Sequence, residues 1–208
     1  RKEKIHDMFN SIAADYDKLN HIMSLDIDKS WRKRALRRIL KSTRDERRAG
    51  REIDEKRRLR SIEVLDVACG TGDFSIAIAE AMRKIARDSS DSGKADAMGH
   101  VTGVDLSEGM LEVMKDKVAK AGLEDLISCE TGDCENLRFQ DNSFDRVTVA
   151  FGVRNFENRE KGLREMLRVL KPGGKLVILE LSVPSNAFMR WLFNLYFLHI
   201  LPLIGGSI

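Results

Sequence analysis

The segment from Val64 to Ser75, VLDVACGTGDFS, joins a short apolar run to two closely spaced glycines. An apolar run that enters a glycine turn and then a helix is typical of a cofactor-binding turn in an α/β protein. The segment lacks the lysine of a phosphate-binding loop, and Ser75 stands where a dinucleotide fingerprint needs its third glycine. Gly70 and Gly72 still allow a ligand to approach the backbone closely. We therefore expect a cofactor that is neither a nucleoside triphosphate nor a dinucleotide.

Asp73 narrows the choice of cofactor further. Its carboxylate stands at the start of the next expected helix, where a pyrophosphate would otherwise bind, and a negative charge there repels phosphate. S-adenosylmethionine carries a ribose, an ammonium group and a sulfonium, and it has no phosphate. The turn therefore favours S-adenosylmethionine, although α/β proteins without a cofactor also contain glycine-rich turns.

Two further carboxylates follow expected strands. Asp105 ends one strand, where a carboxylate can accept hydrogen bonds from both hydroxyls of a ribose. Asp133 follows the next strand, where it would accept from the amino group of adenine while the backbone N–H of Cys134 donates to the ring. Either acid alone could be an ordinary turn or cap residue. Because the carboxyl ends of parallel strands meet at one edge, the three features together suit one adenosyl ligand.

A parallel sheet must bring these residues together, and the hydrophobic pattern predicts one. From residue 62 onward short apolar runs alternate with amphipathic segments, which indicates βαβ units and a doubly wound, mostly parallel sheet of the α/β class. The sequence KPGG is expected to form a turn before the last strand, and Ser107 is expected to cap a helix. The expected strands are 62–67, 100–105, 127–131, 146–150 and 175–181, and the expected helices are 73–87, 107–121 and 160–170.

The 208-residue chain is long enough for one α/β domain, so we expect a single domain whose cofactor-binding core spans 61–182. Residues 1–40 are expected to form a helical cap, because apolar residues recur there at three- and four-residue spacing. Residues 41–60 form a charged insertion, and 87–99 form an exposed polar loop. The chain begins with Arg, without an apolar leader, and we expect it to lack its native start.

The net charge of +3 hides a local imbalance, because residues 29–60 hold 15 Lys and Arg against 5 Asp and Glu. We expect a solvated helix or insertion there, and an anionic membrane surface or RNA is the alternative partner. The cysteines, Cys69, Cys129 and Cys134, form no CxxC pair and no even set, which favours a reducing cytoplasm and argues against disulfides and a zinc site.

Residues 183–208 are expected to form an apolar helix, with large apolar side chains concentrated in 188–204. Polar residues interrupt these 17 residues, and their length is at the short limit for crossing a bilayer. A lid over an isoprenoid tail or an interfacial helix would explain the segment. Core packing or a face between two copies of the chain explains it equally well.

Two stretches carry a family resemblance. Tyr16–Trp31, YDKLNHIMSLDIDKSW, and Arg168–Ser182, RVLKPGGKLVILELS, resemble the signatures of the menaquinone and ubiquinone biosynthesis C-methyltransferases, which are class I S-adenosylmethionine-dependent methyltransferases. In the first stretch Asp28 replaces the usual His before the Trp, and Leu19 replaces the usual Met, so we assign no catalytic histidine there. Family members continue through a final β-hairpin, so we expect this chain to be short at its C-terminus.

The resemblance implies methylation of a ring carbon of a prenylated quinol, with S-adenosylmethionine as the methyl donor. It also implies a set of cofactor contacts in and after the glycine turn. Ala150 stands where the family often has Ser, so a side-chain bond from that position is lost. The expected cofactor-binding residues are Asp66, Gly70, Thr71, Gly72, Asp105, Asp133 and Cys134.

Methyl transfer from a sulfonium is an in-line displacement, which requires alignment and exclusion of water and needs no metal. A quinol carbon attacks only after its neighbouring hydroxyl loses a proton, so a base or cation is needed near that oxygen. Arg154 and Asn155, in AFGVRNF after the fourth expected strand, are expected to stabilise the phenolate and to orient a water. The resemblance adds Tyr16 to this catalytic set. A salt bridge at a helix start is the alternative role for Arg154.

The expected reaction converts 2-demethylmenaquinol to menaquinol, and methylation of a benzoquinol precursor of ubiquinone is the alternative. A nucleic-acid methyltransferase is disfavoured, because the chain lacks an Asn/Asp-Pro-Pro-aromatic turn and a Pro-Cys pair. A regulator that binds the cofactor without catalysis is a third possibility. The expected partners are a lipophilic quinol, the inner face of a membrane contacted peripherally, and a second copy of the chain in a homodimer.

Overall fold

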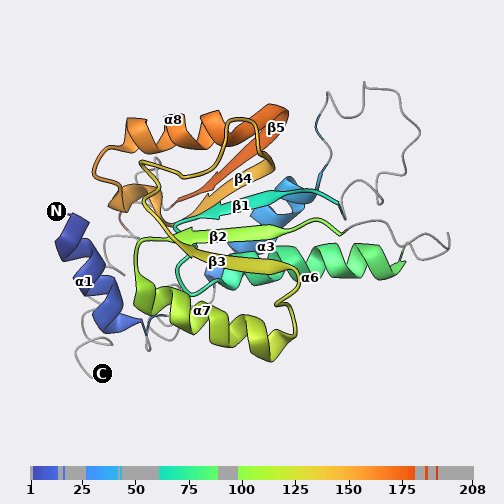
Figure 1. The fold of residues 1–208 in the computed structure, drawn as a ribbon, viewed down its shortest axis with the longest axis horizontal. Coiled ribbons are helices and arrows are strands. Elements are labelled where there is room, and N and C mark those ends of the chain that lie inside the picture. Colours follow the sequence, from blue (N-terminus) through green and yellow to red (C-terminus); the bar gives the residue numbers. More distant parts are fainter. Residues whose placement is uncertain are drawn as a thin grey trace.

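The computed structural model describes residues 2–13, 16, 27–41, 43, 61–88, 98–180, 186 and 191. Within them, five strands form one parallel sheet in the order β3-β2-β1-β4-β5, with helices on both of its faces (Figure 1). The order reverses after β1, which confirms the predicted doubly wound α/β class. The strands are β1 Val64–Val67, β2 Val101–Asp105, β3 Ile127–Thr131, β4 Phe144–Ala150 and β5 Leu170–Leu179.

The described helices lie close to the predicted positions. Ser107 is the N-cap of α7, where its hydroxyl accepts a hydrogen bond from the backbone N–H of Met110, as predicted. Gly122 ends the same helix in the left-handed conformation, with φ of 60°. The helices are α1 Lys2–Ile12, α3 Ile27–Leu40, α6 Asp73–Asp88, α7 Glu108–Ala121, the 3₁₀ helix η1 Val153–Asn155, and α8 Arg159–Val169.

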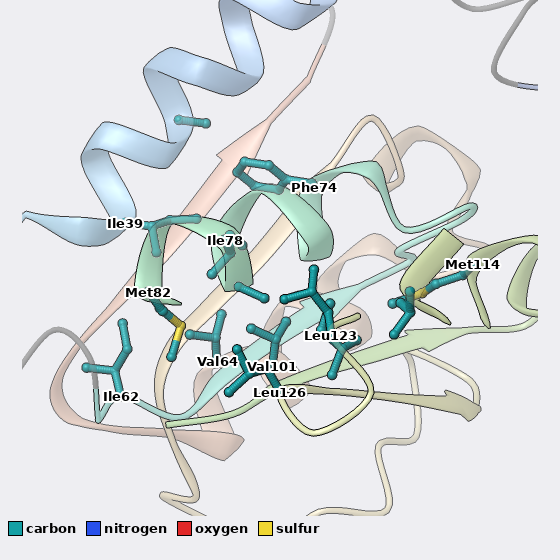
Figure 2. Packing of buried hydrophobic residues seen from close by; sticks show 14 of the residues in the cluster. Ile39, Ile62, Val64, Phe74, Ile78, Met82, Val101, Met114, Leu123 and Leu126 are labelled. Carbon is teal, nitrogen blue, oxygen red and sulfur yellow. The ribbon is translucent and has the colours of Figure 1, made fainter. Parts of the chain in front are cut away.

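Alternating strand residues build two apolar cores, one on each face of the sheet. Val64 of β1 packs on one face with Ile78 of α6 and Ile39 of α3 (Figure 2). Leu65, the next residue in β1, packs on the other face with Met166 of α8. All five side chains are almost completely inaccessible to solvent, and this double burial holds the carboxyl ends of the central strands in fixed positions.

The two N-terminal helices are tied to the sheet and to α7 by hydrogen bonds. Arg146 of β4 is fully buried, and its Nε donates to the carbonyl oxygen of Ile39 near the C-terminal end of α3 (2.9 Å). Asn10 of α1 accepts at Oδ1 from the backbone N–H of Gly109 in α7 (2.9 Å). Met8 of α1 is 48% exposed, whereas Ile5 and Phe9 of the same helix face the sheet edge.

One turn prediction was wrong. Residues 171–174, KPGG, were expected to precede the last strand, but β5 begins at Leu170 and includes them. Leu170 pairs with Phe144 and Lys175 pairs with Arg146, so the four residues between them bulge out of the ladder. Gly173 takes a left-handed φ of 77°, which accommodates the extra residues without ending the strand pairing.

Most of the charged insertion, of the polar loop at 87–99 and of the apolar segment 183–208 lies outside the described residues. The predictions for these segments therefore stay predictions. Among the residues that the structure describes, none of the helices has the length and apolar character needed to cross a membrane.

Candidate functional site

The carboxyl edge of the sheet contains unusual backbone conformations. Ala68, directly after β1, has φ of 52°, and Phe151, directly after β4, has φ of 60°. Residues with a Cβ rarely adopt positive φ, because the Cβ then approaches the backbone carbonyl oxygen. Such strained positions often occur where a protein shapes a site for function. Here both of them border the same cavity.

This cavity encloses about 780 Å³ of space between protein atoms, part of which is open to solvent. The ends of β1, β2, β3 and β4 form one side of it, and Ile5, His6 and Phe9 of α1 line another. Figure 1 shows α1 beside this edge of the sheet. Six of the ten predicted site residues line it. These are Tyr16, Gly70, Asp105, Asp133, Cys134 and Asn155.

Asp105 joins the glycine turn to the start of α7. Its Oδ2 accepts from the backbone N–H of Gly70 (2.8 Å), and its Oδ1 accepts from the backbone N–H of Ser107 (2.9 Å). Burial raises the pKa of the Asp105 carboxyl, and these two hydrogen bonds only partly offset that effect. Each carboxylate oxygen can accept more than one hydrogen bond, so Asp105 fits the predicted role of binding ribose hydroxyls.

The loop after β3 lies beside Asp105. The backbone N–H of Gly132 donates to the carbonyl oxygen of Asp105 (2.9 Å), which fixes the start of this loop. Asp133 then accepts at Oδ1 from the backbone N–H of Glu135 (2.9 Å). Asp133 and Cys134 thus line the cavity next to Asp105, where the predicted adenine contacts require them. Cys134 forms no disulfide with another described residue.

A smaller cavity of about 380 Å³ borders the same glycine turn and shares Tyr16 and Gly70 with the larger one. Asp66 lines it and is almost fully buried. The Oδ2 of Asp66 accepts from the hydroxyl of Ser75 (2.6 Å), whereas its Oδ1 has no hydrogen-bond partner in the described part of the chain. Burial raises the pKa of Asp66 to about 7. A buried carboxyl oxygen without a donor fits a ligand that brings an ammonium group.

Asp73 does not carry the uncompensated charge that its position suggested. Its Oδ2 accepts from Nη1 of Arg32 (2.6 Å), and its Oδ1 forms an ion pair with Nζ of Lys117. Burial alone would raise the pKa of Asp73, but Lys117 and Arg32 outweigh it and hold that pKa below its usual value. The expected repulsion of phosphate by Asp73 is therefore wrong, because two cations neutralise the carboxylate. The missing third glycine remains as the argument against a dinucleotide.

Thr71 and Gly72 lie on the turn but away from the larger cavity. Thr71 is buried and lines only the smaller cavity, where its hydroxyl is 3.4 Å from Nζ of Lys117. Gly72 lines neither cavity. Its φ of 80° and the close approach of Met114 in α7 leave no room for a Cβ. Gly72 therefore packs the turn against α7 and has no ligand contact of its own in this geometry.

The structure separates the three predicted catalytic residues. Asn155 and Tyr16 line the larger cavity from opposite ends of the chain. Arg154 is 44% exposed at its side chain and does not line that cavity. Its Nη1 pairs with Oε1 of Glu180 (2.9 Å), and its backbone N–H donates to Oε2 of the same carboxylate (3.2 Å). The salt bridge that the sequence left open as an alternative is thus present.

Sequence reasoning missed several residues of the site. Phe151 received no role, although its ring contacts Trp31 (6.3 Å between centroids) and lies under the guanidinium of Arg32. Glu135 is buried and lines the cavity, but an acid inside a polar loop gives no periodic signal. The spacing of Ile5 and Phe9, four residues apart on a predicted helix, was the one signal that could have marked α1 as a wall of the site.

The ubiE/COQ5 methyltransferase family model matches residues 1–208. A demethylmenaquinone methyltransferase of Bacteroides fragilis is 40% identical over 99% of this chain and 71% of its own length. The ubiquinone/menaquinone biosynthesis C-methyltransferase UbiE of Geotalea daltonii is 42% identical over 98% of this chain and 74% of its own. A demethylmenaquinone methyltransferase of Staphylococcus epidermidis is 40% identical over 99% of this chain and 71% of its own length.

Solved structures show the same fold. A protein from Methanococcus maripaludis assigned as an S-adenosylmethionine-dependent methyltransferase superposes with a TM-score of 0.60 at 20% identity, over 92% of this chain and 72% of its own. The YcgJ protein of Bacillus subtilis superposes with a TM-score of 0.50 at 25% identity, over 65% of this chain and 50% of its own. These likenesses show that this chain shares its α/β fold with these solved proteins.

Proposed function

The chain belongs to the ubiE/COQ5 methyltransferase family and is an S-adenosylmethionine-dependent methyltransferase, and from this premise we propose that it methylates a ring carbon of a prenylated quinol. The proposed substrate is 2-demethylmenaquinol and the product is menaquinol. Relatives from Bacteroides fragilis and Staphylococcus epidermidis that carry the name demethylmenaquinone methyltransferase support the naphthoquinol. The name of the Geotalea daltonii relative also includes ubiquinone, which keeps a benzoquinol precursor as the second candidate.

One observation supports this proposal most strongly. The cavity at the carboxyl edge is lined both by the predicted adenosyl contacts, Asp105 and Asp133, and by the predicted deprotonation residues, Asn155 and Tyr16. A methyl donor and an acceptor ring can react only when one site holds both, because the displacement is in line. A single cavity with both sets of residues meets that requirement.

In the proposed mechanism Asp105 holds ribose hydroxyls, and Asp133 with the backbone N–H of Cys134 holds adenine. Asp66 and the turn at Gly70 accept the amino-acid end. When bound, S-adenosylmethionine supplies an electrophilic methyl group.

Asn155 and Tyr16 orient a water that takes the proton from the quinol hydroxyl, which raises electron density at the neighbouring ring carbon. Phe9 and Phe156 present apolar surface to the ring and help to exclude bulk water. Arg154 does not line the cavity, so in this proposal its positive charge acts on the phenolate oxygen from outside the lining, and pairing with Glu180 reduces that charge.

A cytoplasmic location with peripheral contact to the inner face of the membrane is part of the proposal, because the proposed substrate is lipophilic. The solvent-facing side of α3 supports it. Lys33, Arg34, Arg37 and Arg38 are exposed there, and no carboxylate among the described residues lies within ion-pair distance of them. An anionic lipid surface attracts such a face.

Transfer of a labelled methyl group tests the proposed function. The protein is incubated under reducing conditions with labelled S-adenosylmethionine and, separately, with a demethylated naphthoquinol, a benzoquinol precursor and bulk tRNA. Label in the naphthoquinol supports the proposal, and label in the benzoquinol alone favours the second candidate. Label in tRNA alone contradicts both.

A further inference from the structure

Glu135 links two loops of the site through one carboxylate oxygen. It lies in the loop after β3 and is only 4% exposed. Its Oε1 accepts from the backbone N–H of Glu157 (2.8 Å) and from that of Asn158 (3.0 Å). Asn158 is the N-cap of α8, so the carboxylate also lies at the positive end of that helix. Burial of an acid with good geometry to two donors makes the contact strong and directional.

The base of Glu135 is fixed by the proposed adenine-binding residue. The backbone N–H of Glu135 donates to Oδ1 of Asp133 (2.9 Å), and the backbone N–H of Asn136 donates to the carbonyl oxygen of Asp133 (2.9 Å). The backbone N–H of Gly132, one residue before Asp133, donates to the carbonyl oxygen of Asp105. A ligand held by Asp133 therefore acts on the same turn that aims the Glu135 side chain.

The other end of the link determines where Asn155 lies. Asn155 precedes Glu157 by two residues, inside a tight turn in which its backbone N–H donates to the carbonyl oxygen of Gly152 (3.0 Å). Phe156, between them, is 5% exposed and packs against Gly162 of α8. Such a short and constrained segment transmits a displacement of Glu157 to Asn155, since little backbone freedom separates them.

We propose that Glu135 is a positioning residue that couples occupation of the adenosyl site to the placement of Asn155 on the cavity wall. The catalytic consequence rests on the proposed function, in which Asn155 orients the water. Without the carboxylate, the loop of residues 151–158 loses two anchoring hydrogen bonds and Asn155 is no longer held toward the acceptor ring. Cofactor binding itself uses Asp105 and Asp133 and depends less on Glu135.

Glu165 of α8 provides a matched control. Its Oε2 accepts from the backbone N–H of Leu137, further along the same loop, at 2.9 Å. The contact therefore also joins this loop to α8 through a carboxylate. Glu165 does not line the cavity and is paired with Arg168. Loss of Glu165 weakens the packing of the loop on α8 but removes no hydrogen bond from the segment that carries Asn155.

Hydrogen exchange of the backbone amides of residues 155–158, with and without S-adenosylhomocysteine, tests the coupling without any turnover. In the full chain and in Glu165→Gln we expect saturating ligand to slow exchange of these amides by about tenfold. In Glu135→Ala the ligand still binds, within about threefold of the original Kd, but the slowing is lost. Glu135→Gln, which keeps one acceptor oxygen, recovers part of it.

Equal ligand protection of these amides in Glu135→Ala and in the unchanged chain would overturn the proposal. If Glu135→Ala does not fold, Glu135→Gln takes its place in the test. Ligand protection of these amides in Glu135→Gln that equals protection in the unchanged chain again overturns the proposal. A kinetic comparison follows: Glu135→Gln lowers kcat about tenfold with little change in the KM for S-adenosylmethionine, whereas Glu165→Gln changes neither. If Glu135→Ala loses the ligand-induced slowing of exchange but the unchanged chain methylates no quinol, the coupling holds and the proposed function is wrong.

Discussion

Oδ2 of Asp105 accepts a hydrogen bond from the backbone N–H of Gly70 at 2.8 Å, which joins the end of β2 to the turn after β1. The residues are 35 positions apart, yet they make up one wall of the cavity. A ligand that binds Asp105 therefore binds to a carboxylate already oriented by two backbone donors. Such prior orientation reduces the entropy lost on binding.

The first prediction concerns this carboxylate. Asp105→Asn keeps the shape but replaces one acceptor oxygen with a donor, so a ribose hydroxyl and one of the two backbone N–H groups lose their partner. We expect the Kd for S-adenosylmethionine to rise by about tenfold to a hundredfold, corresponding to roughly 1.4–3 kcal/mol. Isothermal titration calorimetry measures it. Glu130→Gln, at an exposed end of β3, is the control, and an equal change in both variants would refute the assignment.

A second prediction separates the two glycines of the turn. Gly72→Ala places a methyl group against Met114 at a positive φ, so we expect a loss of unfolding free energy of about 1–3 kcal/mol. Gly70→Ala meets no atom closer than 4.0 Å and suffers only from its φ of 56°, so its loss is smaller. Urea unfolding compares them. Met114 is fully buried, so Met114→Ala is itself destabilising, but in that background Gly72→Ala should cost less free energy of unfolding than in the unchanged chain. An equal cost of Gly72→Ala in both backgrounds would mean that backbone strain alone is responsible.

A third prediction concerns pH. The folded pKa of Asp66 lies at about 7, above its unfolded value near 3.8, so the folded state holds the proton more tightly. The unfolded chain releases this proton first as the pH rises, so Asp66 makes the free energy of unfolding fall between about pH 4 and pH 7. Above pH 7 the contribution is constant.

Asp66→Asn removes this titration. The difference in unfolding free energy between the variant and the unchanged chain should therefore depend on pH between 4 and 7 and become flat above 7. Urea unfolding at several pH values measures that difference. A difference independent of pH throughout would show that the Asp66 carboxyl does not hold its proton in the folded state. The pKa values of Glu63 and Asp105 are also raised, but both residues remain in both proteins. Their contributions to the difference in unfolding free energy therefore largely cancel.

A fourth prediction concerns the ion pair of Arg154 with Glu180. If the guanidinium stabilises the phenolate, Arg154→Ala lowers kcat by at least tenfold while the Kd for S-adenosylmethionine stays within about twofold. Glu180→Gln releases the cation and leaves kcat unchanged or higher. Steady-state kinetics with a short-tailed quinol measures both. Parallel losses of kcat in the two variants would instead indicate that the pair only holds η1 in place.

A fifth prediction concerns the basic face of α3. Lys33→Glu with Arg37→Glu should abolish flotation with vesicles that contain anionic lipid, because two attractive charges become repulsive. The matched control reverses Arg164, an exposed cation of α8. Flotation that does not depend on anionic lipid would rule out this face as the membrane contact. Helix stability is checked by circular dichroism.

The sequence allowed accurate prediction where short-range pattern determines structure. The apolar runs that became β1 and β2 are fully or mostly buried, so their composition is constrained on both faces. Ser107 was predictable as a cap because its partner, Met110, is three residues away. The convergence of Asp105 and Asp133 followed from topology, since parallel strands end at one edge.

Prediction failed where a partner lies far away in the chain. Asp73 appeared as an unpaired charge because Arg32 and Lys117, both more than 40 residues distant, cannot be associated with it by spacing. KPGG has turn composition, and only the pairing with β4 shows that the strand continues through it. Arg154 has the residue type for catalysis, and its pairing with Glu180 depends on how β5 lies beside β4.

The most direct test of the central claim is the position of the transferred methyl group. S-adenosylmethionine with a ¹³C-methyl group is incubated with the protein and demethylmenaquinol under reducing conditions, and the quinol product is examined by carbon NMR and mass spectrometry. The account predicts one ¹³C methyl bonded to a ring carbon, and none with Asp105→Ala. A methyl bonded to the quinol oxygen, or a quinol without label while S-adenosylmethionine is consumed, would contradict it.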